Sequence, residues 1–427
     1  MKLTIHRGAK EIGGTCIELQ SEASRILIDF GMPLVDENRE PFEPDRIRNR
    51  TKDELTAAGI LPDVKGLYKG EQPAVDAIFL SHPHQDHYGL LSYVNPEIPI
   101  YLSQGCSELI KISHYFGQTD YALTNVEAVK AWEPFQKGDF IITPYLVDHS
   151  GFDALAFLIE SEGKRIFYSG DFRGHGRKSV LFDNMLKNPP KKIDYLIMEG
   201  SMLGRDKGRY HTERDLENEL VSTFMEKSPL FFIACSSQNI DRMVSVYRAC
   251  VKSDRIFVID PYTALILDRL RKISKHIPQL DWGSNLRLFF APSRHTDRMA
   301  EDKILYKFRP AKITYQQMHD IRGQLVVKDS YSTRNIFARR NGMTSSRLVY
   351  SMWDGYLPSV EPFWKKHNVP IVKVHTSGHA FIAELQNFAK ALNPKHVIPV
   401  HTFHPEKYLE LFGSKTMMVR DKQTVEV

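Results

Sequence analysis

The chain has 427 residues, of which 42% are hydrophobic and 26% charged, and its formal net charge is +5. These proportions are ordinary for a globular protein, and the length predicts two domains. Because no apolar run is as long as a membrane span and the first residues lack the apolar stretch of a signal peptide, we expect a cytoplasmic protein without membrane contacts. The four cysteines are far apart and form no C-x-x-C pair, so neither a disulfide framework nor a thiolate zinc site is indicated.

Short β-rich segments separated by turns make up the first part of the chain. Residues 3–6, 15–19 and 25–29 are predicted strands, and residues 77–80 form a fourth, fully apolar one. The fourth strand runs almost directly into His82-Pro83-His84-Gln85-Asp86-His87. Imidazole suits zinc and carboxylate is a hard oxygen ligand, so this density of donors would fill parts of two adjacent metal sites. A purely structural interpretation leaves four polar groups beside a hydrophobic strand unexplained.

Further predicted strands, at residues 154–159, 165–168 and 194–198, are also followed or preceded by polar side chains. These side chains are His149, Asp171 and Glu199. Taken singly, each has a simpler interpretation, because Asp171 after a glycine is typical of a turn or N-cap and Glu199 would cap the turn before Gly200.

The middle of the chain changes character. A strand at residues 230–235, a helix to about residue 252 and a strand at residues 255–260 form a βαβ unit. Ser236, Ser237 and Asn239 stand where the first strand passes into the helix, a place where hydroxyls and backbone N–H groups hold phosphates. The alternative is that they are simple N-caps.

The middle segment is also the basic part of the chain. Residues 201–370 contain 28 Lys and Arg against 18 Asp and Glu, whereas the remaining residues contain 29 against 34. A basic domain beside a metal site suits a polyanionic substrate, and the alternative is a solvated surface with chance asymmetry. Arg334, Arg339 and Arg340 flank Phe337, so this stretch would contact phosphates and stack on a base, or form a solvated helix face.

The last part of the chain returns to strand, helix and strand. Residues 369–374 and 396–400 are predicted strands, and residues 381–392 are a predicted helix. His379 follows the first of these strands and His401 follows the second. The candidate donors are therefore spread over most of the chain, and a fold must bring them together.

These motifs resemble those of a known superfamily. His82-x-His84-x-Asp86-His87, His149, Asp171 and His401 are similar to the four metal motifs of the metallo-β-lactamase superfamily, whose fold is an αββα sandwich. Glu199, His379 and His401 resemble the three extra motifs of its β-CASP nuclease branch. Local sequences are similar to the ribonuclease J group in particular, at residues 8–13, 149–154, 170–172 and 375–380. The resemblance implies an α/β fold in which a Rossmann-like β-CASP domain, residues 205–365, is inserted into a metallo-β-lactamase domain formed by residues 1–204 and 366–427.

The same resemblance implies an activity and a set of ligands. The expected activity is hydrolysis of phosphodiester bonds in single-stranded RNA by hydroxide activated at two Zn²⁺ ions, with Mn²⁺ as an alternative metal. The implied ligands are His82, His84 and His149 for one ion and Asp86, His87 and His401 for the other, with Asp171 bridging. His379 would be the general acid and Glu199 would orient it or another histidine. His375 and Ser377 would lie among the substrate contacts.

Other functions stay open. A small ester or thioester hydrolase would share the metal motifs but would not need the basic insert. A DNA nuclease is disfavoured by His401, because DNA-repair members typically have Val at that motif. A binding factor with a silent site would have lost ligands that are all present here.

Two departures from the ribonuclease J pattern concern the loops around the site. Thr402-Phe403-His404 follows His401 in place of Gly-Glu, and residues 344–347 show no clear counterpart of the loop that holds a 5′-monophosphate. Endonuclease and 5′-exonuclease action therefore both stay open. Because the sequence ends at Val427, we expect no C-terminal domain of the kind that many bacterial ribonuclease J proteins use in oligomerisation, and a homo-oligomer is possible but not indicated.

Overall fold

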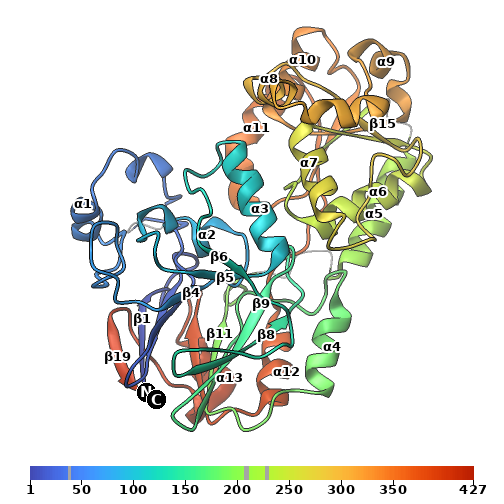
Figure 1. Cartoon of the computed structure of the whole chain (residues 1–427). Helices are drawn as coiled ribbons and strands as arrows, with labels where there is room; N and C mark the ends of the chain where they lie inside the picture. The colour runs from blue at the N-terminus through green and yellow to red at the C-terminus, as the bar shows by residue number, and fades with distance from the viewer. Residues whose placement is uncertain (37–39, 206–210, 227–229) are drawn as a thin grey trace. The chain divides into compact units, whose positions relative to one another are not determined.

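The computed structural model describes residues 1–36, 40–205, 211–226 and 230–427. The chain forms two compact units, which are coloured by residue number in Figure 1. Unit 1 is Met1–Asp206 together with Gly378–Val427, and unit 2 is Lys207–Ser377. Residues 366–377, expected in the lactamase-like part, thus fall in unit 2. No helix among the described residues has the length and apolar character needed to cross a membrane.

Unit 1 contains two sheets. Within the described residues, sheet A has seven strands, of which the first three along the chain pair antiparallel and the next three parallel. The C-terminal strand adds to the edge beside the N-terminal strand, so that the two chain ends lie together (Figure 1). In spatial order sheet A is β19 (Gln423–Glu426), β1 (Lys2–Arg7), β2 (Cys16–Gln20), β3 (Arg25–Ile28), β4 (Ala77–Phe79), β5 (Ile100–Leu102) and β6 (Val126–Ala128).

Sheet B determines where the polar loops meet. In spatial order it is β18 (His396–Val400), β11 (Tyr195–Glu199), β10 (Lys164–Tyr168), β9 (Leu155–Ser161), β8 (Phe140–Leu146) and β7 (Phe135–Lys137). Strands β8 and β10 both pair antiparallel to β9, and β10, β11 and β18 pair parallel to one another. The carboxyl ends of β8, β10, β11 and β18 therefore share one edge of the sheet.

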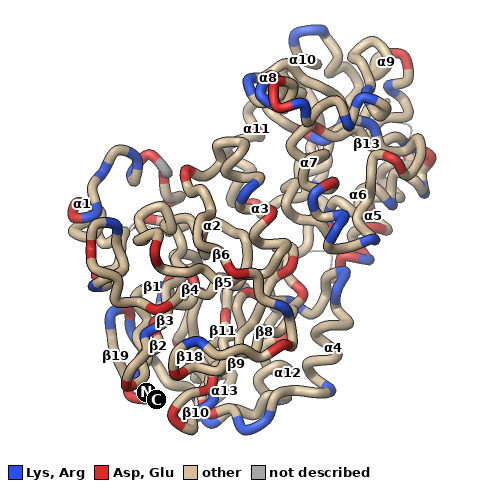
Figure 2. The backbone as a smooth tube through the Cα atoms, viewed as in Figure 1, with Lys and Arg blue, Asp and Glu red and all other residues tan. Residues whose placement is uncertain are grey.

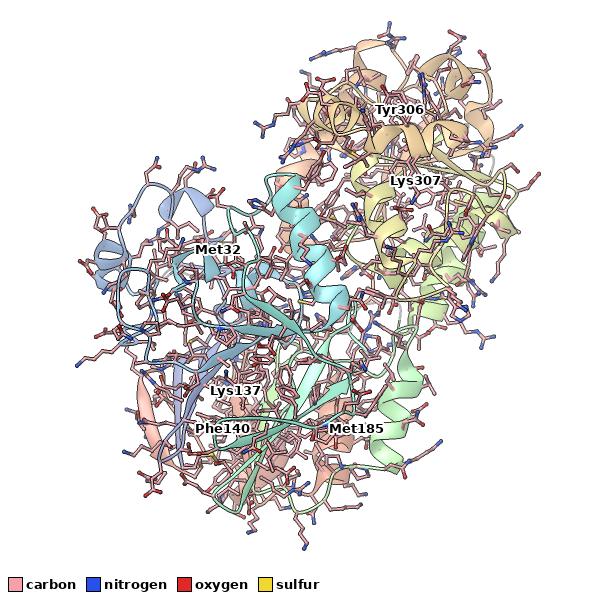
Figure 3. The ribbon with its side chains drawn as sticks, in the orientation of Figure 1. Met32, Lys137, Phe140, Met185, Tyr306 and Lys307 are labelled. Carbon is pink, nitrogen blue, oxygen red and sulfur yellow. The ribbon has the colours of Figure 1, made fainter. Side chains whose placement is uncertain are left out.

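The two sheets pack face to face between helices, as the alternation along β9 shows. Leu155, Phe157 and Ile159 belong to the core between the sheets, whereas Ala156 and Leu158 face the helices that cover sheet B. Phe140 lies in the first of these cores and Met185 in the second (Figure 3). This period of two on both faces is what a strand inside a sandwich requires.

Helices cover the outer face of each sheet. Residues of α1 and α3 pack with the outer residues of sheet A, and residues of α4 and α12 pack with those of sheet B. The unit is therefore the expected αββα sandwich. Its helices are α1 (Lys52–Ala57), α2 (Gln85–Tyr88), α3 (Gln104–Tyr115), α4 (Ser179–Lys187), α12 (Ile382–Leu392) and α13 (Lys407–Phe412).

Unit 2 is built on one parallel sheet, in agreement with the expected βαβ pattern. Its strands in spatial order are β14 (Leu286–Leu288), β13 (Ile256–Ile259), β15 (Leu325–Lys328), β12 (Leu230–Ala234), β16 (Ser346–Tyr350) and β17 (Ile371–Lys373), and neighbouring strands pair parallel. The central strand β12 is buried along its whole length, as expected for a sheet covered on both faces. The helices are α5 (Glu213–Met225), α6 (Ile240–Lys252), α7 (Pro261–Leu270), α8 (Arg294–Glu301), α9 (Tyr315–Asp320), α10 (Tyr331–Arg339) and α11 (Leu357–Lys366).

The core between the sheets of unit 1 gives a stability prediction. Phe157 is fully buried there, 5.9 Å from the ring centroid of Phe79. We expect Phe157→Ala to lower the free energy of unfolding of unit 1 by about 3–5 kcal/mol, because it leaves a large cavity. Ile141→Ala is the control, since Ile141 is on the adjacent strand but 47% exposed. Equal effects of the two substitutions in denaturant titrations would contradict this arrangement.

Candidate metal centre

The donors expected from the sequence gather in unit 1. His82 follows β4, His84 is the N-cap of α2, and Asp86 and His87 lie within that helix. The remaining donors follow, end or precede elements of sheet B and its covering helix. These are His149 after β8, Asp171 after β10, Glu199 at the end of β11, His379 before α12 and His401 after β18. All are buried except His84 and His379, which are partly exposed.

Three imidazoles form the first donor group. His84 Nδ1 lies 3.1 Å from His82 Nε2 and 3.3 Å from His149 Nε2. Atoms that bind one tetrahedral zinc ion at about 2.05 Å are about 3.3 Å apart, so this spacing fits a single ion. The group is therefore suited to hold one metal ion with three neutral nitrogens.

The second donor group contains two carboxylates and two imidazoles. Asp86 Oδ2 is 3.2 Å from His401 Nε2 and 3.8 Å from His87 Nε2. Asp171 Oδ2 is 3.2 Å from His87 Nε2 and 3.7 Å from His82 Nε2, so this carboxylate lies between the two groups. The four donor atoms of the second group all lie within 4.8 Å of one another. Asp171 is thus placed where a bridging ligand would be.

The polar atoms at the centre of the site are better placed to bind a cation than to form hydrogen bonds with one another. Both carboxylate oxygens of Asp171 are buried, and among the described residues neither accepts a hydrogen bond of good geometry. A buried carboxylate without hydrogen bonds is costly, and a metal ion bound by its oxygens removes that cost. The donor set of imidazole and carboxylate is the one that zinc and similar ions take.

The pKa values of the first donor group agree with this interpretation, whereas in the second group the carboxylates of Asp171, Asp29 and Asp86 raise the pKa of His87 despite its burial. Burial, together with the neighbouring imidazoles, lowers the pKa of His82 and His149, and burial lowers that of His84 to about 4. These histidines are therefore neutral at physiological pH, as metal ligands must be. Burial raises the pKa of Asp86, but the charges of His87 and His401 outweigh it and lower that pKa to about 2.

A third group overlaps the second. Asp171, Glu199, His379 and His401 each offer a donor atom, and these atoms also lie within 4.8 Å of one another. His379 Nδ1 is 3.6 Å from Glu199 Oε2 and 3.7 Å from Asp171 Oδ2. Burial acts to lower the pKa of His379, but Glu199 and Asp171 outweigh it and raise that pKa above its ordinary value. The geometry is compatible with a protonated imidazole at this position and with a further metal ligand.

A shell of hydrogen bonds, which the sequence did not reveal, orients the ligands. Asp29 is fully buried, and its Oδ2 accepts from His87 Nδ1 at 2.8 Å and from the Tyr168 hydroxyl at 2.7 Å. The Ser81 hydroxyl lies 3.0 Å from His82 Nδ1, and the Ser201 hydroxyl 2.8 Å from His401 Nδ1. Such partners fix which ring nitrogen faces the metal. Asp29 was expected as the last residue of a strand, and the structure ends that strand, β3, one residue earlier at Ile28.

Glycine-rich loops of unit 1 hold the backbone of these ligands. The Thr15 N–H donates to the Asp86 carbonyl at 3.2 Å, and the His401 N–H donates to the Gly8 carbonyl at 2.8 Å. At Gly31 a Cβ atom would lie 1.6 Å from the Asp86 carbonyl oxygen, so only glycine fits there. The motif at residues 8–13, singled out from the sequence, thus adjoins backbone that holds metal ligands.

The expected substrate contacts before the α6 helix belong to unit 2, and two of them have structural roles. Asn239 is the N-cap of α6 and accepts from the Arg242 N–H at 3.0 Å, which is the alternative that the sequence left open. The hydroxyl of Ser237 is buried 2.8 Å from that of Thr263, whereas Ser236 is exposed.

The other expected contacts in unit 2 also differ in exposure. Arg339 and Arg340 are exposed, but Phe337 is only 3% exposed and packs in the core, so the expectation that its ring would stack on a base is wrong. Burial and the charge of Arg242 lower the pKa of His375 to about 3, and Ser377 is half-buried.

Comparison with known families agrees with the site. Residues 61–225 match a family described as a beta-lactamase superfamily domain, and residues 368–407 match a Zn-dependent metallo-hydrolase RNA specificity domain. The second match contains His379 and His401.

The chain is similar to several curated relatives. It is 22% identical to an RNase J-like protein of Methanocaldococcus jannaschii over 61% of this chain and 58% of that protein. It is 22% identical to ribonuclease J of Mycoplasma pneumoniae over 94% of this chain and 67% of that protein, and 23% identical to ribonuclease J of Helicobacter pylori strain 26695 over 99% and 58%. The chain thus spans 58–67% of the length of these relatives.

A solved structure shares the fold. A protein of unknown function from Enterococcus faecalis V583 superposes with a TM-score of 0.78 at 21% identity, over 99% of both chains. Together, the two family matches and the relatives support a metallo-β-lactamase protein of the β-CASP type that is similar to ribonuclease J.

The carboxylate of Asp29 gives the prediction for this site. We expect Asp29→Asn to weaken metal binding roughly tenfold to a hundredfold, because the amide is a poorer acceptor for His87 and no longer fixes its tautomer. Competition with a chromophoric chelator measures the affinity. Asp139→Asn is the control, since Asp139 also accepts from a serine hydroxyl, that of Ser21 at 2.7 Å. An unchanged affinity in Asp29→Asn would show that this carboxylate does not support the metal.

Proposed function

We propose that the chain is a metal-dependent ribonuclease that hydrolyses phosphodiester bonds of single-stranded RNA with two zinc ions. The observation that carries the proposal is the pair of donor groups that share Asp171, whose oxygen is 3.2 Å from His87 Nε2 in one group and 3.7 Å from His82 Nε2 in the other. Adjacent ions that share a carboxylate are typical of enzymes that act on phosphate esters.

The ligands divide between two ions as the motifs indicate. His82, His84 and His149 would hold one zinc, Asp86, His87 and His401 the other, and Asp171 would bridge them. Zinc bound in this way supplies Lewis acidity and lowers the pKa of water towards neutrality. The same residues accept Mn²⁺ as an alternative.

His379 is the proposed general acid. Its Nδ1 lies 3.6 Å from Glu199 Oε2 and 3.7 Å from Asp171 Oδ2, and these two carboxylates raise the pKa of the imidazole despite burial, which favours the protonated form that a general acid needs. Glu199 holds the adjacent backbone, because its Oε1 accepts from the Ala380 N–H at 3.1 Å and its Oε2 from the Ser201 N–H at 2.9 Å. We therefore assign Glu199 to the positioning of His379.

Several observations favour RNA as the substrate. The relatives that cover most of the chain are called ribonuclease J, and the family matched at residues 368–407 is described by RNA specificity. We assign unit 2 as the inserted β-CASP domain, whose Lys and Arg side chains would bind the phosphate backbone. Figure 2 shows basic residues on several of its elements, among them α7, α8 and α10. Ser236, Arg339 and Arg340 are exposed and remain candidates for such contacts.

A small ester or thioester substrate is the alternative. It shares the metal ligands but gives no reason for a basic, compact unit of this size. The decisive assay uses purified, metal-analysed protein and RNAs labelled at either end and bearing a triphosphate, a monophosphate or a hydroxyl. Product lengths then distinguish internal cleavage from removal of single nucleotides.

The first prediction from this proposal concerns Asp86. We expect wild-type protein to contain about two zinc or similar ions per chain. Asp86→Ala should abolish RNA hydrolysis and lower metal occupancy while the circular dichroism spectrum is kept, because the second donor group loses a charged ligand. Asp53→Ala is the matched control, since Asp53 is 89% exposed. An active preparation without stoichiometric transition metal would disprove the proposal.

The second prediction separates acid catalysis from metal binding. His379→Ala should retain both ions and lose roughly a hundredfold or more in turnover, the scale of a positioned general acid. His401→Ala should instead lose one ion, because its Nε2 lies 3.2 Å from Asp86 Oδ2 in the second donor group. Elemental analysis and turnover measurements on the same samples distinguish a general acid from a metal ligand. If His379→Ala loses an ion, His379 is a ligand, as the third donor group allows.

A further inference from the structure

We infer that His175 and Glu384 are positioning residues that hold His379 against the metal ligands. The inference rests on the proposed function, in which His379 is the general acid. Neither residue belongs to the donor groups of the metal centre, and both lie in unit 1. They affect the reaction because they fix the short segment that carries His379.

His379 stands in a segment without regular structure, between β17 and α12. Hydrogen bonds from elsewhere in unit 1 hold the backbone of the residues on either side of His379. The carbonyl of Gly378 accepts from His149 Nδ1 at 2.7 Å, and the Ala380 N–H donates to Glu199 at 3.1 Å. The Phe381 N–H donates to Glu384 Oε2 at 2.8 Å, so Glu384 holds the start of α12 directly after His379.

Glu384 is in turn fixed by His175. Both of its carboxylate oxygens lie 3.0 Å from His175 Nδ1, which donates to them. The imidazole of His175 is 6% exposed and stacks on the ring of Phe381, with centroids 4.1 Å apart and planes at 12°. His175 therefore contacts the segment after His379 twice, through the carboxylate and through the ring.

His175 belongs to the loop that carries the bridging ligand, since Asp171 is four residues earlier. The loop is anchored at its centre, where the Arg173 N–H donates to the Asp148 carbonyl at 2.7 Å and Arg173 Nε lies 3.4 Å from Asp148 Oδ1. Arg173 and Asp148 are both fully buried, and Asp148 directly precedes the ligand His149.

The loop that carries His175 is closely packed, so His175 and Glu384 have little room to move. A Cβ atom at Gly174 would lie 2.9 Å from Glu384 Oε1, and one at Gly176 would lie 2.3 Å from Asp148 Oδ1. The loop at residues 171–176 thus packs directly against Asp148 on one side and Glu384 on the other. One connected set of contacts links the neighbour of His149, the bridging ligand and the segment of His379.

The consequence is chemical, because general acid catalysis depends on placement of the donor relative to the leaving oxygen. A displacement of about 1 Å at a reacting group costs on the order of a hundredfold in rate. A buried His–Glu pair would also stabilise the fold, and that simpler role must be told apart from positioning. The choice of leaving group distinguishes the two roles.

The experiment compares two substrates in the zinc-loaded protein of 427 residues. RNA has an alkoxide leaving group that needs a proton, whereas bis(p-nitrophenyl) phosphate releases p-nitrophenolate, which does not. We expect His175→Ala to lose roughly ten- to a hundredfold in kcat on RNA, with both ions retained and little change on the nitrophenyl ester. Adding His379→Ala to His175→Ala should give no loss beyond that of His379→Ala alone.

Two further variants act as controls. Glu384→Gln keeps an acceptor for the Phe381 N–H, so its loss on RNA should be smaller than that of Glu384→Ala. His396→Ala removes another histidine stacked on an aromatic ring, that of Tyr195 at 5.2 Å, at the amino end of β18, and should leave both rates unchanged. If His175→Ala is poorly folded, His175→Phe, which keeps a ring against Phe381 but cannot donate to Glu384, takes its place.

The outcomes separate this inference from the proposed function. Equal losses on both substrates, or a loss of metal, would overturn the positioning role and leave a structural one. A normal rate on RNA in His175→Ala, with a large loss in His379→Ala, would overturn only this inference. A His379→Ala protein with full activity on RNA would remove the general acid itself and with it part of the proposed function.

Discussion

The position of the Asp171 carboxylate between two groups of histidines is the interaction around which the metal centre of unit 1 is arranged. A buried carboxylate is tolerable only when positive charge compensates it, and both oxygens of Asp171 face imidazole nitrogens at 3.2–3.7 Å. No single element of secondary structure supplies so many donors. The site exists because strands β8, β10, β11 and β18 end at the same edge of sheet B and β4 of sheet A ends beside them.

This convergence has a cost in backbone conformation. Asp29 and His401 both have positive φ angles, 59° and 52°, which few residues other than glycine adopt. Each is held there by the metal centre and its shell, because Asp29 accepts from His87 and the His401 N–H donates to Gly8. Strained residues of this kind persist where the surroundings determine them, and they gather at functional sites. Asp29 directly follows β3 and His401 directly follows β18, and their side chains contact His87 and Asp86 respectively.

Much of this could be predicted from the sequence, because the ligand-bearing strands are apolar runs that end in polar residues. The strands before His82, Asp171, Glu199 and His401 were expected within a residue or two of where they lie. Strand β8 was not expected, since Pro144 interrupts its pattern. The Pro144 carbonyl points away from β9, because it accepts from the Trp132 N–H. The nitrogen of Pro144 lies on the same side of the strand as this carbonyl, so the missing N–H removes no hydrogen bond between β8 and β9.

The second layer of the site could not be predicted. A lone Asp after a strand, as at Asp29, is far more often a turn residue, and nothing local to Ser201 or His175 indicates a partner 200 residues away. Their roles come from long-range contacts that only the fold defines. The polar strand β19, with the sequence Gln423–Glu426, was missed for a related reason, because its pairing with β1 stabilises it more than its own composition does.

Anomalous X-ray scattering from crystals of the zinc-loaded protein would locate the ions directly. We predict two peaks at the zinc edge in unit 1. One lies among His82, His84 and His149 and the other among Asp86, His87 and His401, with Asp171 in contact with both. A single peak, or a peak bound by Glu199 and His379 in place of the second group, would contradict the assignment of ligands and of the general acid.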